Sequence, residues 1–129
     1  MKPLTIAIDG PSGAGKGTIA RTVAAALGYR HIDSGAMYRA VGWKALQRNV
    51  PFDDEAAIAQ LARQARIDVA NDRVTIDDAD VTRAIRTPEI DRAAAGVARL
   101  PAVRAVLVER QRHLGAGGGI VMEGRLKKE

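Results

Sequence analysis

The feature that most constrains the fold is a glycine-rich segment of nine residues that follows a short apolar run and leads into a helical pattern. Residues 4–8, Leu-Thr-Ile-Ala-Ile, are apolar and β-branched, which predicts a buried strand. Residues 16–27 place apolar side chains at helical spacing, and Gly28 is suited to end that helix. The residues expected on its apolar face are Ile19, Val23, Ala24 and Leu27. The glycine-rich segment consists of Gly10, Pro11, Ser12, Gly13, Ala14, Gly15, Lys16, Gly17 and Thr18.

This segment has the composition of a phosphate-binding loop. Glycines let the backbone curl until successive N–H groups point inward, and the following helix adds the positive end of its dipole. The spacing Gly-x-x-x-x-Gly-Lys between a strand and a helix is typical of nucleoside triphosphate binding, and Lys16 would face the transferred phosphate. Thr18 offers a hydroxyl to phosphate or metal, although Gly17 occupies the position where the common motif has Ser or Thr. The motif does not specify the reaction.

The rest of the chain alternates between helical and strand-like patterns, which predicts an α/β fold. A strand is expected over 29–33, followed by helices over 35–47 and 54–65 and an antiparallel hairpin that joins 67–69 to 74–76. Further helices are expected from Thr87-Pro88-Glu89 to 99 and from 101 onwards, then a glycine break at 115–119 and a strand over 120–122.

Composition excludes several classes of protein. There is no cysteine, so disulfides, cysteine-ligated zinc and thiol chemistry are ruled out. Aromatic residues make up only 3%, so the core must be built from Ala, Val, Ile and Leu, as in buried parallel sheets. No apolar run is long enough for a membrane span, and the N-terminus shows no signal-peptide pattern. A cytoplasmic protein with no membrane partner is therefore expected.

The net charge of +5 is unevenly distributed. Residues 1–52 and 92–129 each carry a net +5, whereas residues 53–91 carry −5. Arginine outnumbers lysine fifteen to five, and few aromatics are present for stacking on bases. This pattern argues against nucleic-acid binding and favours discrete phosphate contacts by arginine.

A second motif narrows the family. Residues 33–39 read Asp-Ser-Gly-Ala-Met-Tyr-Arg, and together with residues 8–18 they make the chain resemble the bacterial cytidylate kinases. Ile-Arg-Thr at 85–87, Pro-Ala-Val-Arg at 101–104 and Glu-Gly-Arg at 123–125 are further matches. The resemblance runs from about residue 4 to residue 125, which is nearly the whole chain.

The resemblance implies transfer of the γ-phosphate of ATP to CMP or dCMP, with Mg²⁺ accompanying ATP. The implied fold is a P-loop nucleoside monophosphate kinase core, a parallel sheet flanked by helices, with a monophosphate-binding insert over about 35–100. The implied CMP-binding residues are Asp33, Ser34, Tyr38, Arg39, Arg104 and Arg125. Lys16, Arg39 and Arg125 are the implied catalytic residues, because their charges offset the repulsion between two anionic nucleotides.

Each of these residues also has a simpler interpretation. Asp33 could only form a turn, Ser34 could only cap a helix, and Arg39 and Arg104 could be solvated arginines of helices. Thr18 and Glu123 are the candidates for holding magnesium, the latter through water, but Glu123 could instead be an exposed carboxylate at a strand end. His31 and His113 are expected at the surface or in packing, and the acidic residues 77–80 in a solvated turn.

The pattern of the family breaks at the end of the chain. Leu126 stands where the family has an aspartate, and the lid that follows in the family is absent. We therefore expect residues 1–129 to form a single, truncated kinase domain with little activity by itself, and to self-associate through an uncovered sheet edge, whereas the full-length family is expected to be monomeric. Two alternatives are a P-loop kinase for another small acceptor and a non-catalytic fragment that binds nucleotides or partners.

Overall fold

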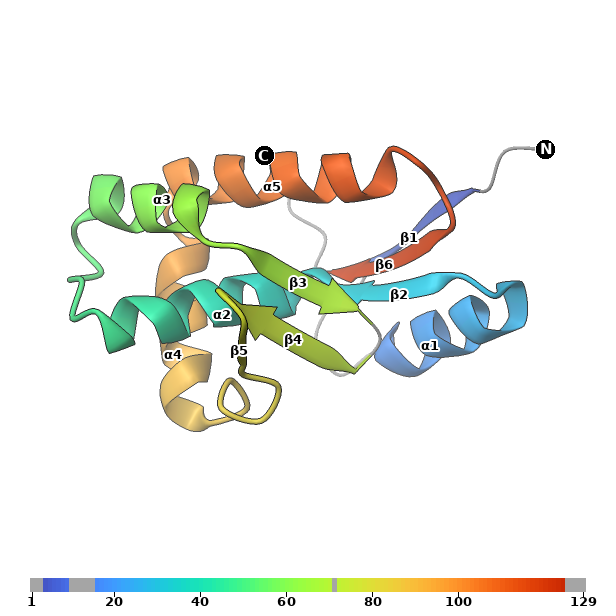
Figure 1. Ribbon diagram of the computed structural model, residues 1–129, viewed down its shortest axis with the longest axis horizontal. Coiled ribbons are helices and arrows are strands. Elements are labelled where there is room, and N and C mark those ends of the chain that lie inside the picture. Colours follow the sequence, from blue (N-terminus) through green and yellow to red (C-terminus); the bar gives the residue numbers. More distant parts are fainter. Residues whose placement is uncertain (1–3, 10–15, 71, 125–129) are drawn as a thin grey trace.

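A computed structural model describes residues 4–9, 16–70 and 72–124, which form two three-stranded sheets and five helices (Figure 1). The first sheet is parallel and has the strand order β1-β6-β2, where β1 is Thr5–Asp9, β6 is Ile120–Gly124 and β2 is Arg30–Asp33. The sheet therefore brings the two ends of the sequence side by side. The α/β class and all three of these strands were predicted by the sequence.

Register places the carboxyl ends of these strands at one edge of the sheet. Asp9 pairs with Gly124 and Asp33 pairs with Glu123, so polar residues from distant parts of the chain are neighbours there. This edge is where ligands bind in parallel α/β sheets.

Helix α1, Lys16–Leu27, covers one face of the parallel sheet, and the side that it turns to the sheet agrees with the expectation for Val23 and Ala24 but not for Ile19 and Leu27. Ala20 and Ala24 are buried against Val121, whereas Ile19 and Leu27 are 53% and 48% exposed. Alanine side chains are small, so the helix can lie close to the strands on this side. The size of the side chains, rather than their hydrophobicity, therefore determines which face of α1 contacts the sheet. Gly28 ends the helix with a positive φ of 67°, as predicted.

The other helices begin at recognisable caps. Helix α2, Ser34–Gln47, is capped by Asp33, whose side chain accepts a hydrogen bond from the Ala36 N–H. Helices α3, Glu55–Gln64, and α4, Pro88–Ala98, are capped in the same way by Asp54 and Thr87. Helix α5, Pro101–Gly115, begins with proline. None of these described helices combines the length and the apolar character that crossing a membrane requires.

The second sheet is antiparallel, in the order β3-β4-β5, with β3 at Ile67–Ala70, β4 at Arg73–Ile76 and β5 at Ala79–Asp80. The hairpin of β3 and β4 was predicted, whereas residues 79–80 were expected in a turn and instead form β5. The turn itself is shorter and is made by Asp77 and Asp78, whose φ values are 49° and 69°. The backbone N–H of Arg66 donates to Asp77 at 2.9 Å and lowers the pKa of that carboxyl, and Lys44 acts in the same direction.

One hydrophobic core joins the second sheet, helices α2 to α5 and the face of the parallel sheet opposite α1. Its large fully buried side chains are Ile32, Met37, Ile58, Ile76, Ile85 and Leu107. Helices α2 and α4 approach each other closely at Gly42, where an added Cβ would lie 3.1 Å from the Ala93 Cβ and 3.2 Å from the Ala93 carbonyl carbon. This packing fixes α4 against α2, and both helices contribute to the site described next.

Candidate nucleotide-binding site

The candidate site lies where β2 and β6 end and α1 begins. Asp33 ends β2, Gly124 ends β6, and Lys16 is the first residue of α1. Of the residues predicted to bind nucleotide, Arg125 and the loop over 10–15 lie outside the described residues, so their roles stay predictions. Thr18 lies exposed in the first turn of α1, where its carbonyl accepts the Thr22 hydroxyl at 2.8 Å.

Asp33 and Ser34 connect the sheet to α2 without an intervening loop. The capping role considered for Ser34 is wrong, because Asp33 is the cap and Ser34 is already in the helix. Ser34 Oγ instead donates to the Glu123 carbonyl oxygen at 2.8 Å, which ties α2 to the end of β6. A Cβ at Gly124 would overlap this hydroxyl, so any larger residue there would displace Ser34 Oγ. Asp33 also lies 3.8 Å from a guanidinium nitrogen of Arg86.

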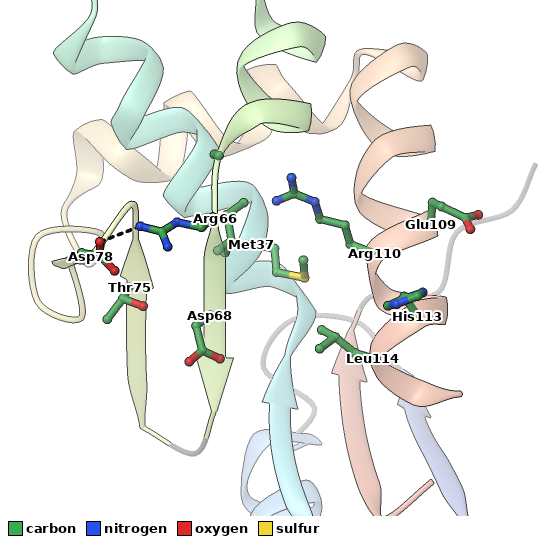
Figure 2. Close-up of a pocket in the computed structure, with 11 residues that line it drawn as sticks. Met37, Arg66, Asp68, Thr75, Asp78, Glu109, Arg110, His113 and Leu114 are labelled. Atoms are coloured by element: carbon green, nitrogen blue, oxygen red, sulfur yellow. Dashed lines mark hydrogen bonds and ion pairs between the residues drawn. The ribbon is translucent and has the colours of Figure 1, made fainter. Parts of the chain in front are cut away.

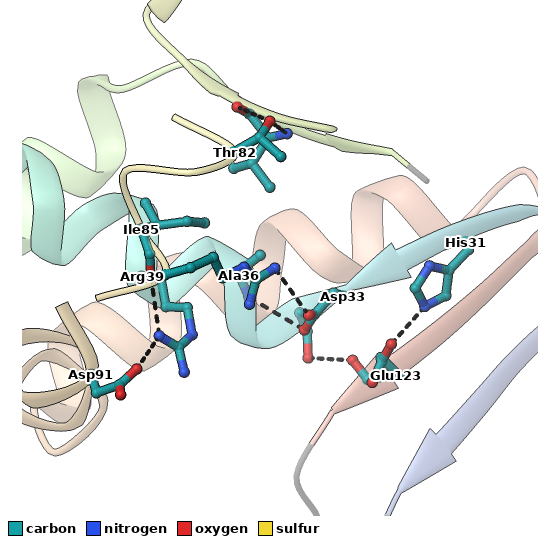
Figure 3. A network of polar contacts seen from close by, with 11 residues as sticks. His31, Asp33, Ala36, Arg39, Thr82, Ile85, Asp91 and Glu123 are labelled. Carbon is teal, nitrogen blue, oxygen red and sulfur yellow. Dashed lines mark hydrogen bonds and ion pairs between the residues drawn. The ribbon is translucent and has the colours of Figure 1, made fainter. Parts of the chain in front are cut away.

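Glu123 and His31 form a buried pair between β6 and β2 (Figure 3). His31 Nε2 lies 2.6 Å from Glu123 Oε1, and the two residues are only 4% and 7% exposed. The alternative of an exposed strand-end carboxylate is therefore wrong for Glu123. Sequence reasoning missed the pair; the available signal was the glutamate directly after the apolar residues of β6, whereas β2 has three polar residues out of four and gives no such signal for His31.

Arg39 is held at a fixed point on α2 (Figure 3). Its Nη1 donates to the Ile85 carbonyl oxygen at 3.2 Å and also contacts the Asp91 carboxylate on α4. The side chain is 28% exposed, so it is neither a fully solvated arginine nor a buried one. Asp91 was not among the predicted site residues.

A cavity of about 390 Å³ opens beside Arg39, between α2, α4 and α5. Its lining consists of Ser34, Gly35, Tyr38, Arg39, Asp91, Ala94, Ala95, Ala98, Val108 and Gln111. The structure thus brings together Ser34, Tyr38 and Arg39, which the sequence analysis grouped as one site. Arg104 lies beside this cavity, because its Nη1 donates to the carbonyl oxygen of the lining residue Ala98 at 2.9 Å.

A second cavity, of about 580 Å³, lies between the β3–β4 hairpin and α5 (Figure 2). It has an apolar floor that includes Met37 and Leu114. Both of its arginines already have protein partners: Arg66 pairs with Asp78 at 2.6 Å, and Arg110 donates to the Arg63 carbonyl oxygen at 2.7 Å. It is also separate from the strand ends, so the cavity beside Arg39 is the better candidate for an anionic ligand.

Comparison with known proteins identifies close relatives. The family model described as cytidylate kinase matches residues 6–126. The chain is 49% identical over 125 residues to a cytidylate kinase of Pelotomaculum thermopropionicum and 50% identical over 127 residues to one of Desulfitobacterium hafniense. These alignments cover 93% and 96% of this chain and 55% of each relative. A bifunctional pantoate ligase/cytidylate kinase of Synechococcus is 49% identical over 131 residues, which cover 96% of this chain and 24% of that protein. The chain thus spans about half the length of the first two relatives and a quarter of the third.

Proposed function

Because this chain belongs to the cytidylate kinase family, we propose that it holds the nucleotide sites of a kinase that transfers the γ-phosphate of ATP to CMP or dCMP. The observation that carries the proposal is the arrangement of Ser34, Tyr38 and Arg39 around one cavity, at the sheet edge where α1 begins. An acceptor in this cavity would lie close to a donor held by residues 10–18. The reaction needs no protein nucleophile, since phosphoryl transfer depends mainly on positioning and charge stabilisation.

The acceptor half of the proposal rests on chemistry at Arg39. A guanidinium has five N–H donors, and among the described residues only its Nη1 is engaged, with Ile85 and Asp91, which leaves donors for a phosphate. Ser34 and Tyr38, which line the same cavity, would contact the nucleoside, with Asp33 shaping its wall. Arg104 would reach the acceptor from its position beside Ala98.

The donor half rests on α1. Its first turn presents unpaired backbone N–H groups and the positive end of the helix dipole directly after the glycine-rich loop. Lys16 would neutralise charge on the transferred phosphoryl group, and so would Arg125, which follows β6 in the sequence. These roles for Lys16 and Arg125 follow the family motif.

The residues at the carboxyl edge of the parallel sheet also fit a hydrated magnesium ion bound to ATP. Magnesium is commonly held by one or two carboxylates together with phosphate oxygens and water, and Glu123 supplies a carboxylate directly behind α1. Within the part of the chain that the structure describes, no group of three or more metal-ligating side chains exists that could hold a cation alone. Bound magnesium would neutralise phosphate charge, while Glu123 and Thr18 would orient it through water.

The test is thermal unfolding of the purified chain, alone and with CMP, dCMP, AMP, UMP or Mg²⁺-ATP. A ligand that binds only the folded state stabilises it by about 2.7 kcal/mol at a hundred times its dissociation constant. We expect CMP and dCMP to raise the midpoint more than AMP and UMP do, and Mg²⁺-ATP to raise it as well. A shift by AMP that equals or exceeds that of CMP would indicate a P-loop kinase for another acceptor.

An activity measurement separates the remaining alternative. Formation of CDP from CMP and ATP by the same preparation would establish the reaction directly. Nucleotide-dependent stabilisation without CDP formation would support a chain that binds nucleotides and is not itself catalytic.

The contact between Asp91 and Arg39 gives a further prediction. The Asp91 carboxylate occupies Arg39 Nη1 and repels an incoming phosphate, so Asp91→Asn should tighten CMP binding by about two- to fivefold, the range expected for a partly exposed ion pair. Isothermal titration calorimetry measures this change. Glu89→Gln, which removes the same charge from the first turn of the same helix, is the matched control and should leave CMP affinity unchanged.

A further inference from the structure

The buried pair of His31 and Glu123 has a role that the family match does not assign. His31 pairs in register with Val121, and Glu123 lies two residues further along β6, so Val121 and Glu123 point to the same face of the sheet. That face is covered by α1, because Val121 packs against Ala20 and Ala24. The pair is therefore enclosed between the strand ends and the first turn of α1.

The hydrogen-bond partners define the state of the imidazole ring. Nε2 lies 2.6 Å from Glu123 Oε1, whereas the buried Nδ1 has no partner among the described residues. A carboxylate oxygen only accepts, so the Nε2–H of His31 donates to Glu123 Oε1. This contact assigns a proton to Nε2.

This hydrogen bond also orients the second oxygen of Glu123. A Cβ added at Gly17 would lie 3.4 Å from Glu123 Oε2, so this oxygen lies against the first turn of α1. Arg21 Nη1 lies 3.7 Å from the same Cβ position. The residue next to Gly17 is Lys16, which completes the glycine-rich motif.

We propose that His31 is a positioning residue that holds Glu123 so that Oε2 faces the hydrated divalent cation accompanying the triphosphate. A carboxylate on a strand end has rotamers that turn it away from α1, and the Nε2–H bond selects the one that faces it. The inference rests on the proposed function, because it requires a triphosphate at residues 10–18. The proposal predicts that replacing His31 reduces the gain in ATP affinity caused by Mg²⁺ and leaves CMP binding in the cavity beside Arg39 unchanged.

The test compares ATP dissociation constants with and without Mg²⁺ in the full chain, measured by calorimetry for the wild type, His31→Phe and His31→Gln. Loss of a group that orients a ligating carboxylate typically lowers metal affinity by about ten- to a hundredfold. The ratio of the ATP dissociation constants without and with Mg²⁺ measures how much Mg²⁺ tightens ATP binding. We expect this ratio to be about tenfold smaller in His31→Phe than in the wild type. In His31→Gln the ratio should recover in part, because the glutamine amide can donate to Glu123 Oε1. CMP affinity should be unchanged, and His113→Phe, at the exposed histidine on α5, should behave as wild type.

A measurement on the wild type keeps the inference testable even if the variants do not fold. The two histidines give separate ring ¹⁵N resonances, and His113 serves as the internal reference. We expect the Nε2–H tautomer for His31, and a shift of its Nε2 resonance with Mg²⁺-ADP that ADP alone does not produce. The inference would be overturned, while nucleotide binding still stood, by either of two NMR results: an Nδ1–H tautomer of His31, or a His31 Nε2 resonance that Mg²⁺-ADP does not shift. It would also be overturned if Mg²⁺ tightened ATP binding by His31→Phe as much as it does in the wild type. Failure of the wild type to bind either ATP or CMP would instead overturn the proposed function, and the inference with it.

Discussion

Replacing Arg39 with alanine should weaken CMP binding by about ten- to a hundredfold, which is the effect of losing hydrogen bonds between a charged donor and a phosphate. The reason is geometric: Arg39 lines the cavity with Ser34 and Tyr38, and within residues 4–9, 16–70 and 72–124 only one of its guanidinium nitrogens has a partner. Titration calorimetry with CMP measures the loss. The affinity for cytidine, which lacks the phosphate, should change by less than about twofold on the same reasoning.

The cytidine measurement separates the two roles that Arg39 has in the structure. Besides facing the cavity, Arg39 joins α2 to the carbonyl oxygen of Ile85 and to Asp91, so its removal also lowers stability. Equal losses for CMP and cytidine would show that the cavity itself had collapsed and would contradict a phosphate-binding role. Arg92→Ala removes a neighbouring exposed arginine of α4 and should leave both affinities unchanged.

Replacing Gly42 with valine should destabilise the fold by about 1–3 kcal/mol, the usual cost of overpacking a close contact. Any Cβ at residue 42 would meet the Ala93 Cβ and two backbone atoms of α4 at 3.1–3.3 Å, and backbone cannot rotate away as a side chain can. Urea unfolding, compared at constant m-value, measures the change.

Gly96→Val is the matched control, because Gly96 also lies within a helix, yet the nearest atom to its added Cβ is Phe52 Cδ1 at 3.8 Å. Valine is a better helix former than glycine by a few tenths of a kcal/mol, so this variant should be neutral or slightly more stable. Equal losses in both variants would mean that helix propensity, rather than the approach of α4 to α2, determines the effect at Gly42.

The helices and most strands could be predicted because their signals are local. Asp54 and Thr87 cap helices at the positions where the sequence indicated, and the hairpin of β3 and β4 follows from alternation on either side of a turn. Strand β5 was missed because two residues carry no periodic signal. The apolar face predicted for α1 was right for Ala24 and Val23 and wrong for Ile19 and Leu27, because the contact also uses Ala20, whose burial depends on how closely the sheet approaches.

The candidate site was predictable only where its residues are contiguous in the chain. Ser34, Tyr38 and Arg39 lie on successive turns of one helix, so a single motif locates all three. The contact of Arg39 with Asp91 and the contact of Glu123 with His31 were both missed, because each contact joins segments that are distant in sequence. Pairing of this kind depends on sheet register and helix packing, which the periodicity of one segment does not determine.

Strand β2 ends at Asp33 and α2 begins at Ser34, so no residue separates extended backbone from helix. Each residue of an α-helix rotates the next side chain by about 100° around the axis. The junction therefore sets the angular phase of the whole of α2 relative to the sheet, and one inserted or deleted residue there would turn Tyr38 and Arg39 out of the cavity while leaving the helix intact. Length changes in this protein can accordingly be accommodated beyond Gln47, at the far end of α2, but not at its origin.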